Sequence, residues 1–169
     1  MPKYGLEFDL VESNRQIAQL GDFLRSNVGL YDHTRHFEWV ETTCLPAITT
    51  DKRRALAWWE HGQMVGDAVL KPLDVGLVEL KNFRVANHAE QRGLGGLMMK
   101  HAFLETQDLL AEKGLLDERG ENITLQLDTT EGGVAQAFFE HVGFDVVETS
   151  DLYTPGKAEV IMQRQISLH

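Results

Sequence analysis

The feature that most constrains this chain is a cluster of three glycines, Gly93, Gly95 and Gly96, in the stretch "EQRGLGGLMM". Glycine is a poor residue for a helix interior, so three of them where a long helix begins need a reason. The backbone N–H groups of a first helical turn have no partner within the helix and lie at the positive end of its dipole. Glycine leaves them open to close approach, so the stretch predicts a cradle for a pyrophosphate or similar anion. Tight helix–sheet packing, or a simple turn, is the alternative interpretation.

Two common phosphate-binding motifs do not fit this stretch. A Walker A loop needs a Gly-Lys-Ser or Gly-Lys-Thr sequence, and none follows the glycines. A dinucleotide fingerprint needs G-x-G-x-x-G after the first strand and an acidic residue at the end of the next strand. The segment Gly93–Gly96 lacks that spacing, and the strand before it comes late in the chain.

Composition narrows the class of protein. The 169 residues, 43% hydrophobic and 25% charged, predict one domain over 1–169 with a core of its own. The single cysteine, Cys44, allows no internal disulfide and no cysteine-rich zinc site. We expect a cytoplasmic protein without a membrane segment, because no apolar run approaches the ~18 residues that span a bilayer. The net charge of -10 argues against nucleic acid as a partner and favours a cationic one.

Hydrophobic periodicity predicts interspersed strands and helices, which is typical of a mixed α/β protein. Strands are expected at 4–12, 76–85, 123–130, 144–149 and 158–166, and a hairpin at 53–72 with a bulge marked by Gly66. Helices are expected at 14–27, within 33–45, at 95–113 and within 132–144. Ser13 or Asn14 is suited to cap the first helix, because a side-chain oxygen there accepts a hydrogen bond from the first turn.

Three stretches follow one another in an order typical of a known family. "AWWEHGQMVGDAVL" (57–70) is the hairpin, "VELKNFRVANHAEQRGLGGLMM" (78–99) is a strand, a loop and the glycine-rich helix start, and "LQLDTTEGGVAQAFFEHVGF" (125–144) is a strand and a short helix ending in Gly-Phe. In this order and spacing they resemble motifs of the GNAT superfamily of N-acetyltransferases, the second of them the acetyl-CoA-binding motif. The match runs from about Ala55 to the C-terminus. The first 50 or so residues fit the family's variable N-terminal region, which commonly builds the acceptor site.

The resemblance implies a fold and a cosubstrate. The fold is a GNAT-like mixed, twisted sheet of about six or seven strands with helices on both faces, and its central strands, Leu77–Val85 and Ile123–Asp128, are splayed at the coenzyme site. The cosubstrate is acetyl-CoA, without a metal. Backbone N–H groups from Gln91 through Gly96 would hold the pyrophosphate, and the backbone of Val85 would pair with the pantetheine arm or the thioester oxygen. The residues implied to bind coenzyme are Phe83, Arg84, Val85, Gln91, Arg92, Gly93, Leu94, Gly95, Gly96 and Phe138.

The resemblance also implies a reaction, in which a primary amine attacks the thioester directly in a ternary complex. An alkyl amine, with a pKa of roughly 10.4, is mostly protonated at neutral pH, so a base must take its proton. Glu79 is the candidate base, since it matches the catalytic glutamate of the histone acetyltransferase branch. Its alternative interpretation is a glutamate on a solvated strand face, or one paired with Lys81. Many members use a tyrosine as the acid that protonates the leaving thiolate; here that position is Phe139, so Tyr153 is the candidate acid, with water as the alternative.

Several features keep other interpretations open. Glu90 stands where glutamine or arginine is usual, and Glu90 and Phe139 together favour a non-catalytic module that binds acyl-CoA and regulates a partner. A third class, an acyltransferase for amines linked to nucleic acid, is opposed by the net charge. The acceptor amine, the acyl chain length and a homodimer are left open. His33 and His36 indicate a polar helix face rather than a metal site, and His88 and His101 have no evident partner.

Overall fold

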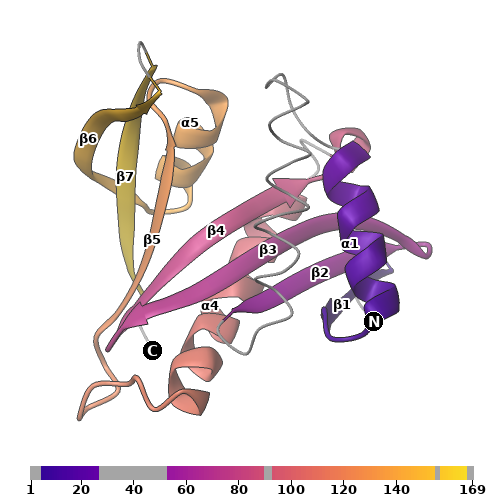
Figure 1. Ribbon diagram of the computed structural model, residues 1–169, viewed down its shortest axis with the longest axis horizontal. Helices are drawn as coiled ribbons and strands as arrows, with labels where there is room; N and C mark the ends of the chain where they lie inside the picture. The colour runs from indigo at the N-terminus through magenta and orange to yellow at the C-terminus, as the bar shows by residue number, and fades with distance from the viewer. Residues whose placement is uncertain (1–4, 27–52, 90–92, 155–156, 167–169) are drawn as a thin grey trace. The chain divides into compact units, whose positions relative to one another are not determined.

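The structure, a computed structural model, describes residues 5–26, 53–89, 93–154 and 157–166. They form a seven-stranded mixed sheet in the order β1-β2-β3-β4-β5-β7-β6 together with three described α-helices (Figure 1). The strands are β1 Leu6–Leu10, β2 Arg54–Glu60, β3 Gln63–Asp74, β4 Leu77–Val85, β5 Ile123–Thr130, β6 Asp145–Thr154 and β7 Lys157–Ile166. The helices are α1 Asn14–Ser26, α4 Leu94–Glu112 and α5 Val134–His141, with a 3-10 turn at Asn87–Ala89.

Every strand that the sequence predicts is present, and each described helix was predicted to within a few residues. The helix expected within 33–45 lies outside the described residues, as do His33, His36 and Cys44. None of the helices in the described ranges is long and apolar enough to cross a membrane.

The chain divides into two compact units, each considered by itself below. The first comprises residues 1–71 and 82–102, and the second comprises 72–81 and 103–169. Strands β3 and β4 and helix α4 each contribute residues to both units.

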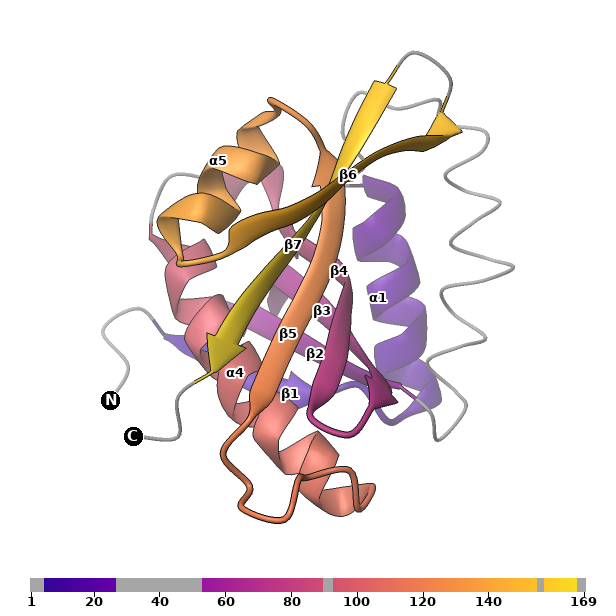
Figure 2. The same cartoon turned by 90° about the vertical axis from the view of Figure 1, so that its left-hand side faces the viewer.

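In the first unit, β1, β2 and β3 pair antiparallel, and α1 and the start of α4 cover opposite faces of them (Figure 2). Ser13 and Gln16 form a capping box at the start of α1: the Gln16 N–H donates to Ser13 Oγ, and the Ser13 N–H donates to Gln16 Oε1. Leu20 and Leu24, one turn apart on α1, are completely buried. The predicted cap and apolar face therefore direct this helix onto the sheet.

The β2–β3 hairpin has the turn and the bulge that the sequence predicts. His61 and Gly62 have φ values of 52° and 78°, the left-handed pair that a two-residue hairpin loop requires. The register shifts between Trp58 and Trp59, which pair with Gly66 and Met64. The bulge therefore lies next to Gly66.

In the second unit, the start of β4 pairs parallel with β5, and β7 pairs antiparallel with both β5 and β6. Alternation along β5 buries Ile123, Leu125 and Leu127. Figure 2 shows α5 lying along the strands of this unit.

Arg164, on β7, binds the backbone just after the end of α5. Arg164 donates through Nη1 to the carbonyl oxygen of Val142, and its guanidinium lies over the Phe103 ring, 4.3 Å from the centroid. A Cβ atom on Gly143 would come within 3.2 Å of Arg164 Nη1, so glycine leaves the room that this arrangement needs. The Gly-Phe pair that ends α5 is thus also a docking point for β7.

Two glycines test how far backbone crowding controls the fold. We expect Gly76→Ala to destabilise the protein by about 3 kcal/mol, because φ is 69° and an added Cβ would overlap the Asn122 carbonyl oxygen. Gly62→Ala, with φ of 78° but open space around the Cβ, should lose only about 1 kcal/mol. Urea unfolding of both variants measures the difference, and equal losses would contradict it.

Candidate functional site

The end of β4 and the start of α4 lie in the first unit and contain most of the residues that the sequence singles out for coenzyme. Phe83, Arg84 and Val85 end β4, and all three are half-buried. The Ala86 N–H donates to the Val65 carbonyl oxygen at 2.8 Å, which ties the end of β4 to β3. Gln91 and Arg92, both predicted to bind coenzyme, and Glu90 lie outside the described residues.

The helix start carries glycines that packing does not explain. Gly93 has φ of 75°, a left-handed conformation that glycine adopts without strain, and α4 begins at the next residue, Leu94. A Cβ atom added to Gly93 or to Gly96 would meet no other atom of the described residues within 4 Å. The turn interpretation therefore accounts for Gly93, while tight helix–sheet packing accounts for neither residue. Gly96 stands inside the first helical turn without a structural reason.

Gly66 on β3, in the same unit, is a glycine that close packing does require. A Cβ atom there would overlap the side-chain end of Met98, on α4, and would come within 3.2 Å of the Arg84 carbonyl oxygen. The helix and the end of β4 thus both approach the β3 backbone at this residue. Close packing therefore explains Gly66 but not Gly96, whose role in coenzyme binding stays a prediction.

A buried carboxyl lies next to this region, and the sequence analysis missed it. Asp67, on β3, is completely buried, and its Oδ2 accepts a hydrogen bond from Asn82 Nδ2 on β4. Its Oδ1 and the buried Nε of Arg84 have no hydrogen-bond partner in the described part of the chain. Burial raises the pKa of the Asp67 carboxyl to about 7, although the Asn82 hydrogen bond and the Arg84 charge act in the opposite direction. The available signal was an acidic residue inside the apolar run "MVGDAVL".

Glu79, the candidate base, lies in the second unit, where β4 starts. Its Oε1 forms an ion pair with Lys81 Nζ at 3.1 Å, and its side chain is 16% exposed. The expected pairing of Glu79 with Lys81 is therefore present. It is compatible with a role as general base, because the second carboxylate oxygen of Glu79 is not part of the ion pair. Gln126, its register partner on β5, accepts a hydrogen bond from Gln163 at 2.7 Å. Glu79 thus stands beside a polar pair that crosses from β5 to β7.

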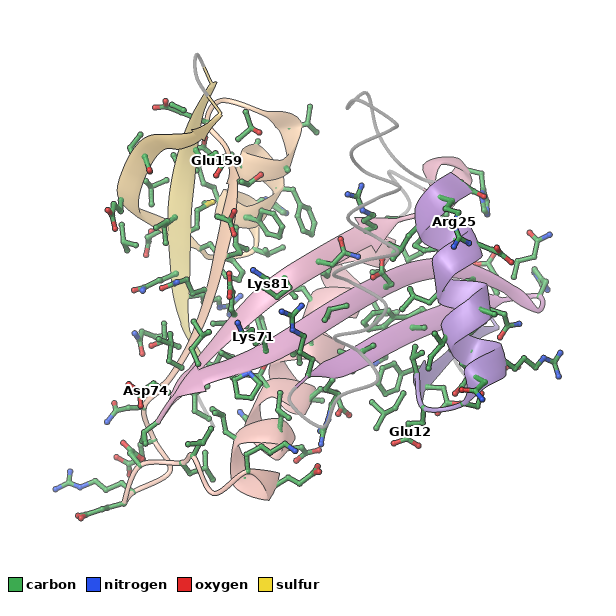
Figure 3. All side chains as sticks on the ribbon, viewed as in Figure 1. Glu12, Arg25, Lys71, Asp74, Lys81 and Glu159 are labelled. Carbon is green, nitrogen blue, oxygen red and sulfur yellow. The ribbon has the colours of Figure 1, made fainter. Side chains whose placement is uncertain are left out.

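Figure 3 labels Lys81 on β4 and Glu159 on β7, two charged residues of the second unit. Burial raises the pKa of the Glu159 carboxyl, and the nearby negative charge of Asp128 raises it further. Within the described ranges, no three His, Cys, Asp or Glu side chains form a group that could hold a metal ion.

The structure describes the side chain of Phe139 at the usual tyrosine position, but not that of Tyr153. Phe139 is 7% exposed and packs edge-on against Phe138 and Phe144, so this position belongs to the core. Phe138 beside it is half-buried. Tyr153 was expected in the loop before the last strand, but its backbone belongs to β6, which continues to Thr154; its side chain lies outside the described residues.

His101, which the sequence left without a partner, does have one. The indole Nε1 of Trp58 donates to His101 Nδ1 at 2.8 Å, and the two rings are stacked. Phe8 packs against both rings. The expectation for His101 was wrong because Trp58 lies 43 residues away in sequence, and only the tertiary fold brings the two together. This contact ties α4 to β2.

Among comparisons with known proteins, only those with solved structures find matches. No family model and no curated protein sequence matches the chain. Solved structures match over nearly its whole length. An acetyltransferase of the GNAT family from Desulfovibrio desulfuricans has a TM-score of 0.70 at 18% identity, covering 95% of this chain and 98% of its own. The ribosomal-protein-S18-alanine N-acetyltransferase from Escherichia coli has 0.70 at 16% identity (97% and 96%), and an aminoglycoside 6′-N-acetyltransferase complexed with coenzyme A has 0.71 at 16% identity (94% and 96%).

The chain has the GNAT fold. The mixed α/β sheet of six or seven strands, predicted from the glycine stretch and its flanking motifs, is thereby confirmed. The individual site residues stay predictions, as does the parting of the two central strands. In other solved structures with the GNAT fold, coenzyme A is bound to a Thermoplasma acidophilum protein and acetyl-CoA to one from Elizabethkingia anophelis.

The open space at Gly96 generates a prediction with two opposed readouts. Gly96→Ala should stabilise the protein by about 0.5–1 kcal/mol, because alanine favours the helix and its Cβ meets nothing. The same Cβ should weaken coenzyme A binding, because it occupies the space that a pyrophosphate needs. Thermal unfolding and calorimetric titration with coenzyme A measure the two effects, and undiminished binding would remove Gly96 from the candidate site.

The buried carboxyl makes stability depend on pH. Between about pH 4 and pH 7 folded Asp67 keeps its proton, with a pKa of about 7, whereas the unfolded chain loses it at the ordinary value of 3.8. The wild-type protein should therefore lose stability as the pH rises through this range, by up to about 4 kcal/mol relative to Asp67→Asn. Urea unfolding measures the difference, and a constant difference at all pH values would contradict it. Asp74→Asn, at the exposed end of the same strand, is the control (Figure 3).

Proposed function

We propose that this protein transfers an acetyl group from acetyl-CoA to a primary amine, by direct attack in a ternary complex. The fold supports the general class, because the solved structures that match it are acetyltransferases, among them one complexed with coenzyme A. The observation that carries the proposal is the helix start: among the described residues, no atom lies within 4 Å of a Cβ placed on Gly93 or Gly96, where α4 begins.

Coenzyme would be held by main-chain groups of the first unit. The N–H groups of Gly93 through Gly96 have no partner of the i−4 kind within α4, and the helix dipole favours an anion there. Gln91, Arg92 and the half-buried Phe83 and Arg84 complete the proposed set in this unit. Phe138, a residue of the second unit, is proposed to bind coenzyme on the sequence resemblance alone. The Val85 main chain would face the thioester, where an N–H donor to the developing oxyanion contributes several kcal/mol in a dry site.

Glu79 is the proposed acceptor of the amine proton, directly or through one water molecule. The ion pair with Lys81 holds Oε1 of this carboxylate in place and leaves Oε2 to face the amine. For the donor to the leaving thiolate, the sequence argument alone supports Tyr153.

The proposed acceptor is a cationic amine. The net charge of -10 attracts cations, and the matched solved structures include one named for an aminoglycoside and one named for a ribosomal-protein alanine. Both a small amine and a peptide N-terminus or lysine therefore fit this proposal.

A second candidate function is a regulatory module that binds acyl-CoA without turnover. Phe139 favours it, since the position that carries a proton donor in many GNAT enzymes is here part of an aromatic core. Thiol release from acetyl-CoA, measured with polyamines, aminoglycosides and alanine-terminated peptides, separates the two functions. Coenzyme binding without turnover on any amine would support the module.

Glu79→Gln tests the proposed base. We expect kcat/KM to fall about 100-fold with little change in coenzyme affinity, because the amide cannot accept the amine proton. Glu148→Gln, an exposed glutamate on strand β6, is the matched control and should keep the wild-type rate. Equal rates for wild type and Glu79→Gln would contradict the assignment.

A further inference from the structure

Acyl transfer from a thioester ends with a thiolate that takes up a proton, and the described residues leave the source of that proton open. The usual tyrosine position is Phe139, whose phenyl ring has no proton to donate and is packed between Phe138 and Phe144. Other ionisable groups close to the end of β4 are therefore the candidate proton donors.

Asp67 is such a group, and it is unusual for three reasons. It is an acidic residue with no exposed surface, in a strand segment whose neighbours Val65 and Val69 are also buried. Only one of its carboxyl oxygens, Oδ2, has a hydrogen-bond partner, the Asn82 side chain. Buried polar atoms are nearly always paired, so an oxygen without a partner points to a group that is absent from the empty protein.

A second unpartnered atom belongs to the same cluster. Arg84 Nε is buried and has no hydrogen-bond partner among the described residues, and the Arg84 charge acts on Asp67. An acceptor and a donor thus both remain unsatisfied where β3 meets β4. A ligand atom or a water molecule between them would satisfy both.

The cluster lies next to the proposed thioester position. Asn82 and Arg84 come three residues and one residue before Val85, which is within about 10 Å along a strand. The bond from the Ala86 N–H to the Val65 carbonyl oxygen fixes β3 against this end of β4. All of these residues belong to the first unit, so the placement does not depend on the second.

We propose that Asp67, in its protonated form, is the acid that delivers a proton to the departing coenzyme A thiolate, from Oδ1 directly or through one water molecule. The proposal rests on the acetyl transfer proposed above and adds the group that completes it. It makes Asp67, rather than Tyr153 or bulk water, the donor.

The proton balance closes without a further reagent. The ammonium group gives one proton to Glu79 and its nitrogen then forms the C–N bond to the thioester carbon. When the C–S bond breaks, the sulfur keeps the electron pair and takes the proton of Asp67. The nitrogen loses its second proton to the Asp67 carboxylate by way of water, which restores the acid, and Glu79 releases its proton to solvent.

The environment of Asp67 suits an acid that works near neutral pH. Burial raises its pKa to about 7, against the hydrogen bond from Asn82 and the charge of Arg84. Of the strands packed against it, β4 contributes those two groups and β2 places the uncharged Ala57 in register with it. In well-studied enzymes, a carboxyl group in an apolar site acts as a general acid while a second carboxyl in a different environment has another role.

Asp67→Asn is the first test, with the fastest amine of the panel as acceptor. We expect kcat to fall about 100-fold at pH 6, and the ratio of wild-type to variant kcat to shrink about tenfold per pH unit above pH 7, where the wild-type acid has lost its proton. Asp74→Asn is the matched control on the same strand and should follow the wild-type profile. An unchanged kcat, or a loss that is equal at every pH, would overturn the proposal.

A change of leaving group separates proton donation from a structural effect. The selenoester analogue of acetyl-CoA releases a selenolate, which leaves readily without a proton. With this donor Asp67→Asn should regain most of the wild-type rate, whereas Glu79→Gln should stay slow because its step comes earlier. A defect in Asp67→Asn that is the same with both donors would indicate a packing role and would overturn the proposal.

These experiments also distinguish a failure of the Asp67 assignment from a failure of the proposed acetyl transfer. If the wild-type protein binds coenzyme A but turns over neither donor with any amine, acetyl transfer itself is wrong, and the role of Asp67 is wrong with it. If the wild-type protein turns over both donors and Asp67→Asn matches it throughout, only the assignment of the acid is wrong.

Discussion

The close approach of α4 to β3 at Gly66 is the contact on which the candidate coenzyme site depends. Met98 and the Arg84 carbonyl oxygen both lie so near this glycine that a single methyl group would displace them. The hydrogen bond from Trp58 to His101 holds the same helix one turn further along. With α4 held in this way, its first turn begins close to the end of β4, and packing among the described residues does not require the glycine at Gly96.

The contrast between two carboxyl groups organises the proposed chemistry. Glu79 has a lysine beside it and keeps some contact with solvent, whereas Asp67 is enclosed and shares one hydrogen bond with an amide. A low-dielectric interior disfavours the charged form of a carboxyl, and a nearby cation favours it. The proposed mechanism therefore gives these two carboxyl groups different roles, as base and as acid.

Local sequence pattern predicted most of the fold, because strands and helices follow from periodicity and from turn residues close by in the chain. Ser13, His61-Gly62 and Gly93 are such cases, since each acts within a few residues of itself. The same reasoning found the glycine-rich helix start, while the coenzyme segment around it stays a prediction. It missed Asp67, Arg164 and the Trp58–His101 bond, because each acts through a partner on another element. It also left the number of strands between six and seven, since the pairing of β6 and β7 rests on contacts that no short window contains.

Gly96 has a consequence for anyone who improves this protein in the laboratory. A selection that rewards only heat resistance would favour alanine at this position, because the empty protein has nothing there for a methyl group to disturb. Under the proposed coenzyme role of Gly96, stable clones that bind coenzyme poorly would then accumulate unless binding is selected at the same time. The proposed role thus explains a glycine inside a helix for which the described structure gives no packing reason.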